Sequence, residues 1–321
     1  MFAQRSTRHP TVLILVALMA LAVAACSNVG SGGTLTARSP DTGTIAPVSP
    51  EPSAEPTAAA PSEPPVESEA PTTPEPTEAP SGATSVKVYL FMDGQLVPVR
   101  RQVDETRAVG RAALNALFEG PTAEEAAASP SLTTSVPDGT ILLGLDIADG
   151  LATVDLSREF ESGGGSASMF GRLAQVVYTL TQFPTVKQVA FQLDGEPVTV
   201  FSGEGIVLDE PSDREDYEAF LPSVFVDQPT WGATLGNPVR VSGIANVFEA
   251  VFFIEIRDAE FQTRPAERVM ASCGTGCWGT FDVTIPYDAV RMHPGNLVTY
   301  HLSAMDGSIE DLRSYPVTLV P

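Results

Sequence analysis

A long segment near the N-terminus limits where packed domains can form in this chain of 321 residues. Residues 27 to about 83 consist mainly of Pro, Glu, Ser, Thr and Ala and contain almost no large apolar side chain. Such a segment cannot bury enough apolar surface to offset the entropy lost on ordering. Twelve of the 28 prolines lie within it, which favours extended polyproline II over a compact coil. We therefore predict a disordered tether over residues 26–84, followed by folded domains.

The first 26 residues have the pattern of a bacterial secretion signal. Arg5 and Arg8 precede an apolar run over residues 12–25, which is too short to cross about 30 Å of hydrocarbon as a helix. We assign residues 1–25 to a lipoprotein signal peptide. The run ends in Val-Ala-Ala before Cys26, which resembles the bacterial lipobox. The resemblance implies lipid on the Cys26 thiol and anchoring at the extracytoplasmic face of the bacterial cell membrane.

The acidic composition excludes two classes of partner. The chain has a formal net charge of −22, whereas proteins bind the phosphates of nucleic acid through surplus Lys and Arg. Anionic bilayers likewise attract polybasic segments rather than an acidic body. We therefore expect no nucleic acid partner, and we expect the lipid anchor to hold the folded part away from the bilayer.

Residues 85–205 alternate between strand and helix patterns. Alternating apolar residues predict strands near residues 86–90, 141–147, 152–156, 189–193 and 198–200. Apolar residues at helical spacing predict helices over 105–118 and over about 166–183. Gly120-Pro121 and Phe183-Pro184 end the two predicted helices, and Asp-Gly pairs at 149–150 and 194–195 form the turns between strands. The order β-α-β-β-α-β-β predicts an α+β domain with a mixed sheet and two helices packed on one of its faces.

Residues 223–321 show no clear helical period. Short apolar runs recur there between turn residues, and about seven short strands at this spacing predict an all-β immunoglobulin-like sandwich. The cysteine pair that joins the two sheets of antibody domains is absent, so the prediction depends on strand spacing. The segment between the two domains, residues 206–222, is acidic and ends in proline, and we interpret it as a linker.

Both folded regions carry motifs of known families. Residues 85–205 resemble the GerMN domain of sporulation and spore-germination proteins through EGPT at 119–122, VPDGT at 136–140, DGLATVDLS at 149–157, QVVYTLTQF at 175–183 and DGEPV at 194–198. The last hundred residues resemble the Gmad-type immunoglobulin-like domain through VSG at 241–243, ANVFEA at 245–250 and CGTGCWG at 273–279.

The resemblance implies an envelope lipoprotein that acts as a non-catalytic scaffold or interaction module for an envelope protein complex. The alternative is a cell-wall module that binds peptidoglycan or another glycan. The chain has one GerMN-like segment where the founding proteins have two, which argues against a ring-building role. The resemblance also does not establish a role in sporulation.

Two cysteines remain once the lipidated residue is set aside. Cys273 and Cys277 form an even pair, which outside the cytoplasm favours a disulfide. The two glycines between them allow the backbone to turn tightly enough. A zinc site would need two further ligands, and His293 and His301 belong to no ligand motif. We therefore predict a disulfide and no metal site.

No motif of a catalytic site is present. Asp155, Glu159 and Glu161 could be posed as the acid and base of a glycosidase, but forty acidic residues make chance pairs common and no apolar pocket is indicated. The acidic residues over 209–216 lack the spacing of a calcium loop. Gly163-Gly164-Gly165 lacks the Lys of a phosphate loop, and no serine nucleophile motif occurs. We predict no enzyme and no cofactor.

Four residues are candidates for an interaction surface. Tyr178 and Gln182 lie near the end of the second predicted helix, and Phe248 and Trp278 lie in the predicted sandwich. Exposed aromatic side chains mark partner sites, whereas buried ones pack within their own domain. The sequence leaves both alternatives open for each of the four.

Overall fold

The computed structural model describes residues 82–258, 266–289 and 291–321. The predicted signal peptide, Cys26 and nearly all of the predicted tether lie outside these residues. Within the described ranges, no helix is long and apolar enough to cross a membrane. The two predicted domains belong to one compact unit.

The first region begins with a long hairpin. β1 (Ala83–Met92) pairs with β2 (Gln95–Asp104) across the turn Asp93-Gly94, where both residues have positive φ as a tight hairpin requires. β3 (Leu132–Thr133) pairs only with the last two residues of β1, giving the sheet order β2-β1-β3. The strand expected near residues 86–90 is therefore part of a longer hairpin.

The second sheet of this region is mixed. Its order is β4-β5-β6-β7, with β5 and β6 parallel and the other pairs antiparallel. The strands are β4 (Leu142–Ala148), β5 (Leu151–Leu156), β6 (Gln188–Leu193) and β7 (Glu196–Pro197). A crossover through η1 (Arg158–Glu161) and α3 (Ser166–Leu180) joins the parallel pair. The predicted mixed sheet is confirmed.

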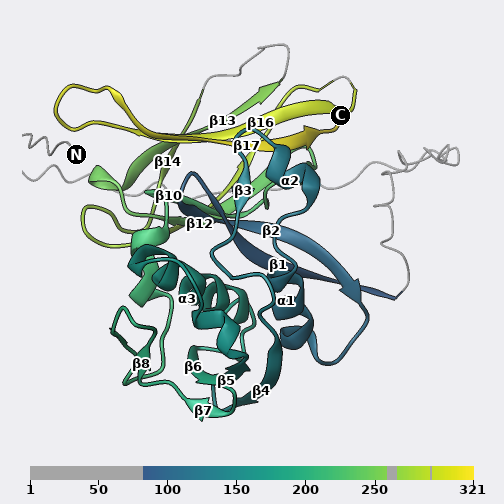
Figure 1. The fold of residues 1–321 in the computed structure, drawn as a ribbon. Coiled ribbons are helices and arrows are strands. Elements are labelled where there is room, and N and C mark those ends of the chain that lie inside the picture. The colour runs from purple at the N-terminus through teal and green to yellow at the C-terminus, as the bar shows by residue number, and fades with distance from the viewer. Residues whose placement is uncertain (1–81, 259–265, 290) are drawn as a thin grey trace, which may run out of the picture. The chain divides into compact units, whose positions relative to one another are not determined.

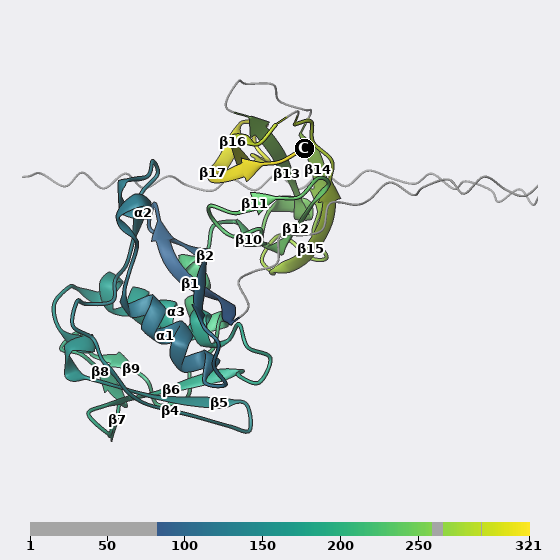
Figure 2. The same ribbon diagram turned by 90° about the vertical axis from the view of Figure 1, so that its right-hand side faces the viewer.

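The helices lie between the two sheets. α1 (Val109–Phe118) and α3 contact each other and β1, and they also contact β4 and β6 respectively, as Figures 1 and 2 show. The short α2 (Ala123–Ala127) follows α1. Both helices lie on one face of the mixed sheet, as predicted, but β1 does not belong to that sheet, because it pairs with β2 and β3 in a second sheet on the other side of the helices. α1 starts at Val109, four residues later than predicted, and Glu105 still belongs to the hairpin, because its N–H donates to the Gly82 C=O at 2.8 Å.

The predicted linker, residues 206–222, is packed against the first region. β9 (Ile206–Val207) pairs with β8 (Val200–Phe201), and Ser212 exchanges backbone hydrogen bonds with Val189 at 2.8 and 2.9 Å. The following η2 (Glu215–Phe220) buries Tyr217. A few apolar residues thus pack this segment against the first region, although its average composition is acidic.

The C-terminal region is an immunoglobulin-like sandwich, as predicted. One sheet has the order β10-β12-β15 and the other β11-β17-β16-β13-β14. The strands are β10 (Val224–Gln228), β11 (Thr234–Leu235), β12 (Val239–Ala245), β13 (Val251–Asp258), β14 (Glu267–Met270), β15 (Gly279–Ile285), β16 (His293–Leu302) and β17 (Ile309–Leu319). Alternate inward residues such as Phe252 and Phe281, whose ring centroids are 4.8 Å apart, form the core.

Candidate functional site

Side chains of α3 and the residues just after it close one edge of β1. β3 reaches only the end of β1, which leaves backbone groups of Lys87 and Tyr89 without a strand partner. The Gln182 side chain accepts from the Lys87 N–H (2.8 Å) and donates to its C=O (2.6 Å). Gln175 donates to the Tyr89 C=O (2.8 Å), and the Thr179 hydroxyl accepts from the Tyr89 N–H (3.4 Å). Spacings of four and three residues put these side chains on one helical face.

Tyr178 and Gln182, two candidates for an interaction surface, therefore act inside the molecule. Tyr178 is buried, and its ring meets the Tyr89 ring edge-on at 5.5 Å between centroids. Burial raises the pKa of the Tyr178 phenol, so this side chain stays neutral. For these two residues the structure favours contacts within the domain over an exposed partner site.

A polar cluster links β1 to β10. The Lys87 ammonium lies 2.6 and 2.7 Å from the two carboxylate oxygens of Asp227, and the Tyr89 hydroxyl donates to the same carboxylate at 3.0 Å. Burial raises the pKa of Tyr89, which keeps its hydroxyl protonated as a donor. The cluster joins the first region to the sandwich through an ion pair whose side chains are partly exposed to water, at 21% and 29%.

The Arg214 guanidinium lies beside this cluster. It lies over the rings of Tyr178 and Tyr89, at 4.6 and 5.5 Å from their centroids. Its Nε donates to the Thr181 hydroxyl at 2.8 Å, and its Nη2 donates to the Tyr89 hydroxyl and the Tyr178 C=O at 3.3 Å. The side chain is held in one orientation by stacking and by three hydrogen bonds.

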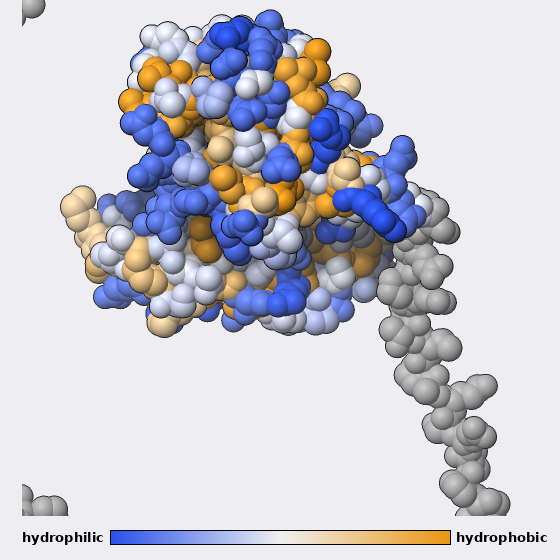
Figure 3. Space-filling model, turned by 90° about the horizontal axis from the view of Figure 1, so that it is seen from below, coloured by the Kyte–Doolittle hydropathy of each residue, from blue (hydrophilic) through white to orange (hydrophobic). Residues whose placement is uncertain are grey.

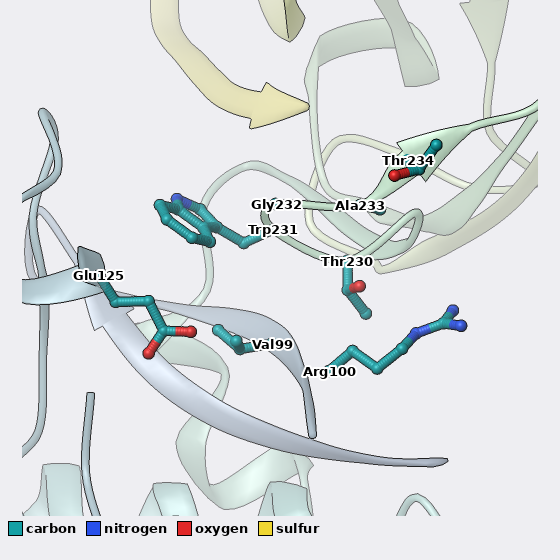
Figure 4. A pocket seen from close by; sticks show the side chains of 8 residues that line it. All are labelled: Val99, Arg100, Glu125, Thr230, Trp231, Gly232, Ala233 and Thr234. Atoms are coloured by element: carbon teal, nitrogen blue, oxygen red, sulfur yellow. The ribbon is translucent and has the colours of Figure 1, made fainter. Parts of the chain in front are cut away.

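A second link runs through the loop between β10 and β11. The Trp231 N–H donates to the Pro98 C=O on β2, and the Gly232 N–H donates to the Pro316 C=O on β17, both at 2.9 Å. A pocket of about 420 Å³ lies beside this link (Figure 4). Its one carboxylate, from Glu125, pairs with Arg101 at 2.6 and 2.7 Å and caps α2. That carboxylate therefore has a structural role and is not free to act as a catalytic acid or base.

A cleft of about 490 Å³ opens beside the middle strand of the smaller sandwich sheet, and we name it the β12 cleft. Its lining combines a cation, two carboxylates, two hydroxyls and apolar side chains from Arg214, Phe225, Asp227, Ser242, Gly243, Ile244, Thr280, Phe281 and Asp282. Asp227 is paired with Lys87, and Asp282 is paired with Arg240. The cleft therefore offers both hydrogen-bond donors and acceptors around a partly apolar floor.

The outer edge of β4 is open. Among the residues that the structure describes, β4 is the first strand of its sheet and pairs only with β5. Leu143 is 47% exposed, Ile147 is 40% exposed, and the neighbouring Ile141 is 59% exposed. Asp146 is the one charged residue within the strand. Figure 3, a view from below Figure 1, shows hydrophobic residues in separate groups among hydrophilic ones.

The disulfide loop is anchored to the turn that carries Phe248. Cys273 and Cys277 form the predicted disulfide, with their Cα atoms 5.9 Å apart. Backbone N–H groups of Thr275 and Gly276 donate to the Val247 C=O and the Asn246 side chain at 2.9 and 3.0 Å.

The two remaining candidates for an interaction surface lie at this end of the sandwich. Phe248 is 50% exposed, whereas Trp278 is partly buried and packs against the core. Phe248 therefore has the exposed position that a partner site requires, whereas Trp278 mainly packs within its own domain.

The carboxylates considered for glycosidase chemistry each have a local partner. Asp155 accepts from the Gly195 N–H at 2.8 Å, Glu159 accepts from the Ser162 hydroxyl at 2.9 Å, and Glu161 lies 3.5 Å from Arg158. Within residues 82–258, 266–289 and 291–321, no group of three or more His, Cys, Asp or Glu side chains could hold a metal ion.

Arg172 is a structural residue that the sequence did not reveal. It is 2% exposed and donates to the carbonyls of Phe160, Ser162 and Gly163 at 2.6, 2.9 and 3.0 Å. Burial lowers the pKa of its guanidinium. Arg172 thereby fixes the glycine-rich loop before α3, and its sequence signal was that it is the one charged residue of this helix.

Two family comparisons agree with this architecture. Residues 87–199 match the family described as sporulation and spore germination, and residues 223–308 match the immunoglobulin-like domain of bacterial spore germination. The chain thus combines a GerMN-type domain with a Gmad-type immunoglobulin-like domain.

Individual relatives match parts of the chain. Lipoprotein LpqB of Thermobifida fusca (strain YX) is 29% identical over 140 residues, which cover 44% of this chain and 21% of the relative. The chain therefore spans about a fifth of that curated relative. The first GerMN domain of the sporulation protein GerM from Bacillus subtilis is 20% identical, covering 41% of this chain and 99% of that chain at a TM-score of 0.36. The tandem GerMN domains of GerM are 15% identical, covering 74% and 61% at a TM-score of 0.37.

Proposed function

We propose that this protein is a non-catalytic interaction module of the bacterial cell envelope that binds a partner protein through the open edge of β4. The observation that carries the proposal is the exposure of Leu143 and Ile147 on a strand that pairs along one side only. An unpaired edge strand is a template for a strand from another chain, and natural proteins usually protect such edges with charges, proline or a covering element. β4 contains one charge and no proline, and it carries a β-bulge at Leu143, where Leu142 and Gly144 pair with consecutive residues of β5.

The expected occupant is an extended segment of the partner protein that adds a strand to the sheet. Backbone hydrogen bonds would supply affinity, and alternate side chains would contact Leu143 and Ile147. Asp146 lies on β4, and Asp149 lies in the turn after it. Their charges favour a segment in which Lys or Arg alternates with apolar residues.

Lipid anchoring at Cys26 is part of the proposal. Its support is the lipobox-like Val-Ala-Ala-Cys26 after an apolar run, and the name of the related protein, which is a lipoprotein. Such an anchor would place the module at the extracytoplasmic face of the membrane. Substituting Cys26→Ser is expected to release the chain from the membrane fraction, and retention of the variant there would contradict the anchor.

The non-catalytic character is supported by the carboxylates. Asp155, Glu159 and Glu161 are engaged by local partners, whereas a glycosidase needs a carboxyl group in an apolar pocket opposite a second, ionised one. The alternative function, recognition of a cell-wall glycan, is favoured by one observation, the mixed polar lining of the β12 cleft.

In-cell crosslinking of the tagged chain with Cys26 intact, followed by affinity purification and mass spectrometry, tests the proposal. We expect one reproducible membrane protein partner. Its recovery should be lost with Leu143→Lys and retained with Val207→Lys. The control changes an apolar side chain of the same domain that is also exposed, at 63%, but lies outside β4. Recovery of the partner protein with the Leu143→Lys variant, or recovery of wall fragments alone, would contradict binding through the β4 edge.

A further inference from the structure

The β12 cleft is lined by one cationic side chain, that of Arg214. The hydrogen bonds of Arg214 to described residues use Nε and Nη2, and a guanidinium carries five N–H donors, more than these three bonds employ. Stacking over Tyr89 and Tyr178 fixes the guanidinium before any ligand arrives. A pre-oriented donor of this kind contributes to binding without a further ordering cost.

The same cleft contains acceptors of opposite charge. Asp227 and Asp282 both line it, and each is already paired with one cation, Lys87 or Arg240. A carboxylate has about four lone-pair sites, so each can accept further hydrogen bonds. The hydroxyl of Ser242, on the central strand, can both donate and accept.

The mixture of charges decides the class of ligand. A small anion at Arg214 would also face two carboxylates, and a small cation at the carboxylates would face Arg214. An apolar ligand would strip water from all three charged groups without replacing their hydrogen bonds. A hydroxyl group can accept from the guanidinium and donate to a carboxylate, so a ligand rich in neutral hydroxyls satisfies both kinds of group.

We propose that the β12 cleft is a binding site for a neutral saccharide of one or two sugar units. Its volume of about 490 Å³ lies within the range of small-molecule sites. The partly exposed side chain of Ile244 in the lining provides apolar surface for the C–H face of a sugar ring. The site is separate from the β4 edge and does not depend on binding of a protein partner there.

Titration of the full chain with neutral disaccharides tests the site. Cellobiose and di-N-acetylchitobiose are the probes, acetate and methylammonium are the charged comparisons, and the readouts are calorimetry and the NMR shift of the Ile244 methyl groups. We expect at least one disaccharide to bind and to shift Ile244, while neither charged compound does. Absence of binding by both disaccharides, or an equal response to acetate or methylammonium, would overturn the proposal.

Two cleft variants and one matched control locate the binding. Ser242→Ala and Asp282→Asn each remove hydrogen-bonding capacity and should weaken disaccharide binding about tenfold. Thr284→Ala changes an exposed residue on the same strand as Asp282 but outside the cleft, and it should leave binding unchanged. Binding that is unaffected by both cleft variants would place the saccharide elsewhere and overturn the proposal. Loss of saccharide binding in the β12 cleft does not affect capture of a partner protein through Leu143, so either proposal can fail without the other.

Discussion

β1 and β4 each pair fully along one side only, yet the GerMN-type domain treats their other sides in opposite ways. The free groups of β1 are closed by Gln175, Thr179 and Gln182 from α3 and the residue pair after it. The outer edge of β4 keeps exposed apolar side chains and has no strand partner among the described residues. Both edges carry the same kind of backbone groups, so the difference lies in what covers them.

The comparison separates a structural edge from a candidate functional one. Closing β1 requires buried side-chain amides, which are costly unless every hydrogen bond is made. The domain meets that requirement on the side where the sandwich attaches. On the side of β4 it leaves the strand open, which is the side we propose for a partner.

The largest effect is expected from opening the closed edge. Gln175→Leu keeps the volume but removes partners of the Tyr89 C=O and the Ser135 N–H, and should destabilise the protein by about 2–4 kcal/mol. Urea unfolding measures the change. Gln188→Leu, at an exposed glutamine on β6, is the control and should shift the free energy of unfolding by less than about 0.5 kcal/mol. Equal effects of the two variants would show that closure of β1 contributes nothing to stability.

A smaller loss is expected at the ion pair beside that edge. Asp227→Asn keeps the shape but leaves the Lys87 ammonium without its counter-charge. The pair is partly solvated, so we expect a loss of about 1–2 kcal/mol, below that of a fully buried pair. A double-mutant cycle with Lys87→Met isolates the interaction between the two side chains. Additive single effects would contradict a direct contribution of the pair.

The hydrogen bond between Ser223, the first residue of the sandwich, and Asp311 on β17 should make stability depend on pH. Burial raises the pKa of Asp311, but hydrogen bonds from the Ser223 N–H and charge and hydrogen bonding from Arg313 outweigh it, so the folded pKa lies below the usual value. Stability from this group is present above the unfolded pKa, about 4, and is lost as pH falls through the lower folded pKa. Unfolding at a series of pH values should show a shallower acid loss for Asp311→Asn. An unchanged acid profile would contradict this assignment.

The smallest change in stability is expected at the open edge. Leu143 is half exposed, so Leu143→Lys should alter the free energy of unfolding by less than about 0.5 kcal/mol. The same substitution should abolish partner capture, which distinguishes a binding role from a structural one. A loss above about 1 kcal/mol would mean that Leu143 stabilises the domain and would weaken the case for an open edge.

The sequence predicted the positions of helices and strands better than which of them pair or pack together. Apolar spacing located α3 and the sandwich strands, but it did not single out Gln175, Thr179 and Gln182, whose common role is seen in the structure. Their target could not be inferred, because the separation of β1 from the mixed sheet depends on β2. The turn at Asp93-Gly94 was an available signal for that hairpin.

The candidate sites were harder to predict than the fold. Lys87 and Asp227 are 140 residues apart, and their pairing follows from how the sandwich attaches. The open edge of β4 depends on which strand ends the sheet, and periodicity within one strand cannot decide that. The disulfide was predictable because both cysteines lie within one short turn.

The dipeptide Trp231-Gly232 has a consequence for cooperativity. Its two amide groups bond to Pro98 in the GerMN-type domain and Pro316 in the last strand of the sandwich. Melting either domain removes a partner from this dipeptide and exposes the Lys87–Asp227 pair to water. In a calorimeter the GerMN-type domain and the immunoglobulin-like domain should therefore unfold in a single transition, with equal van't Hoff and calorimetric enthalpies, rather than as two independent modules.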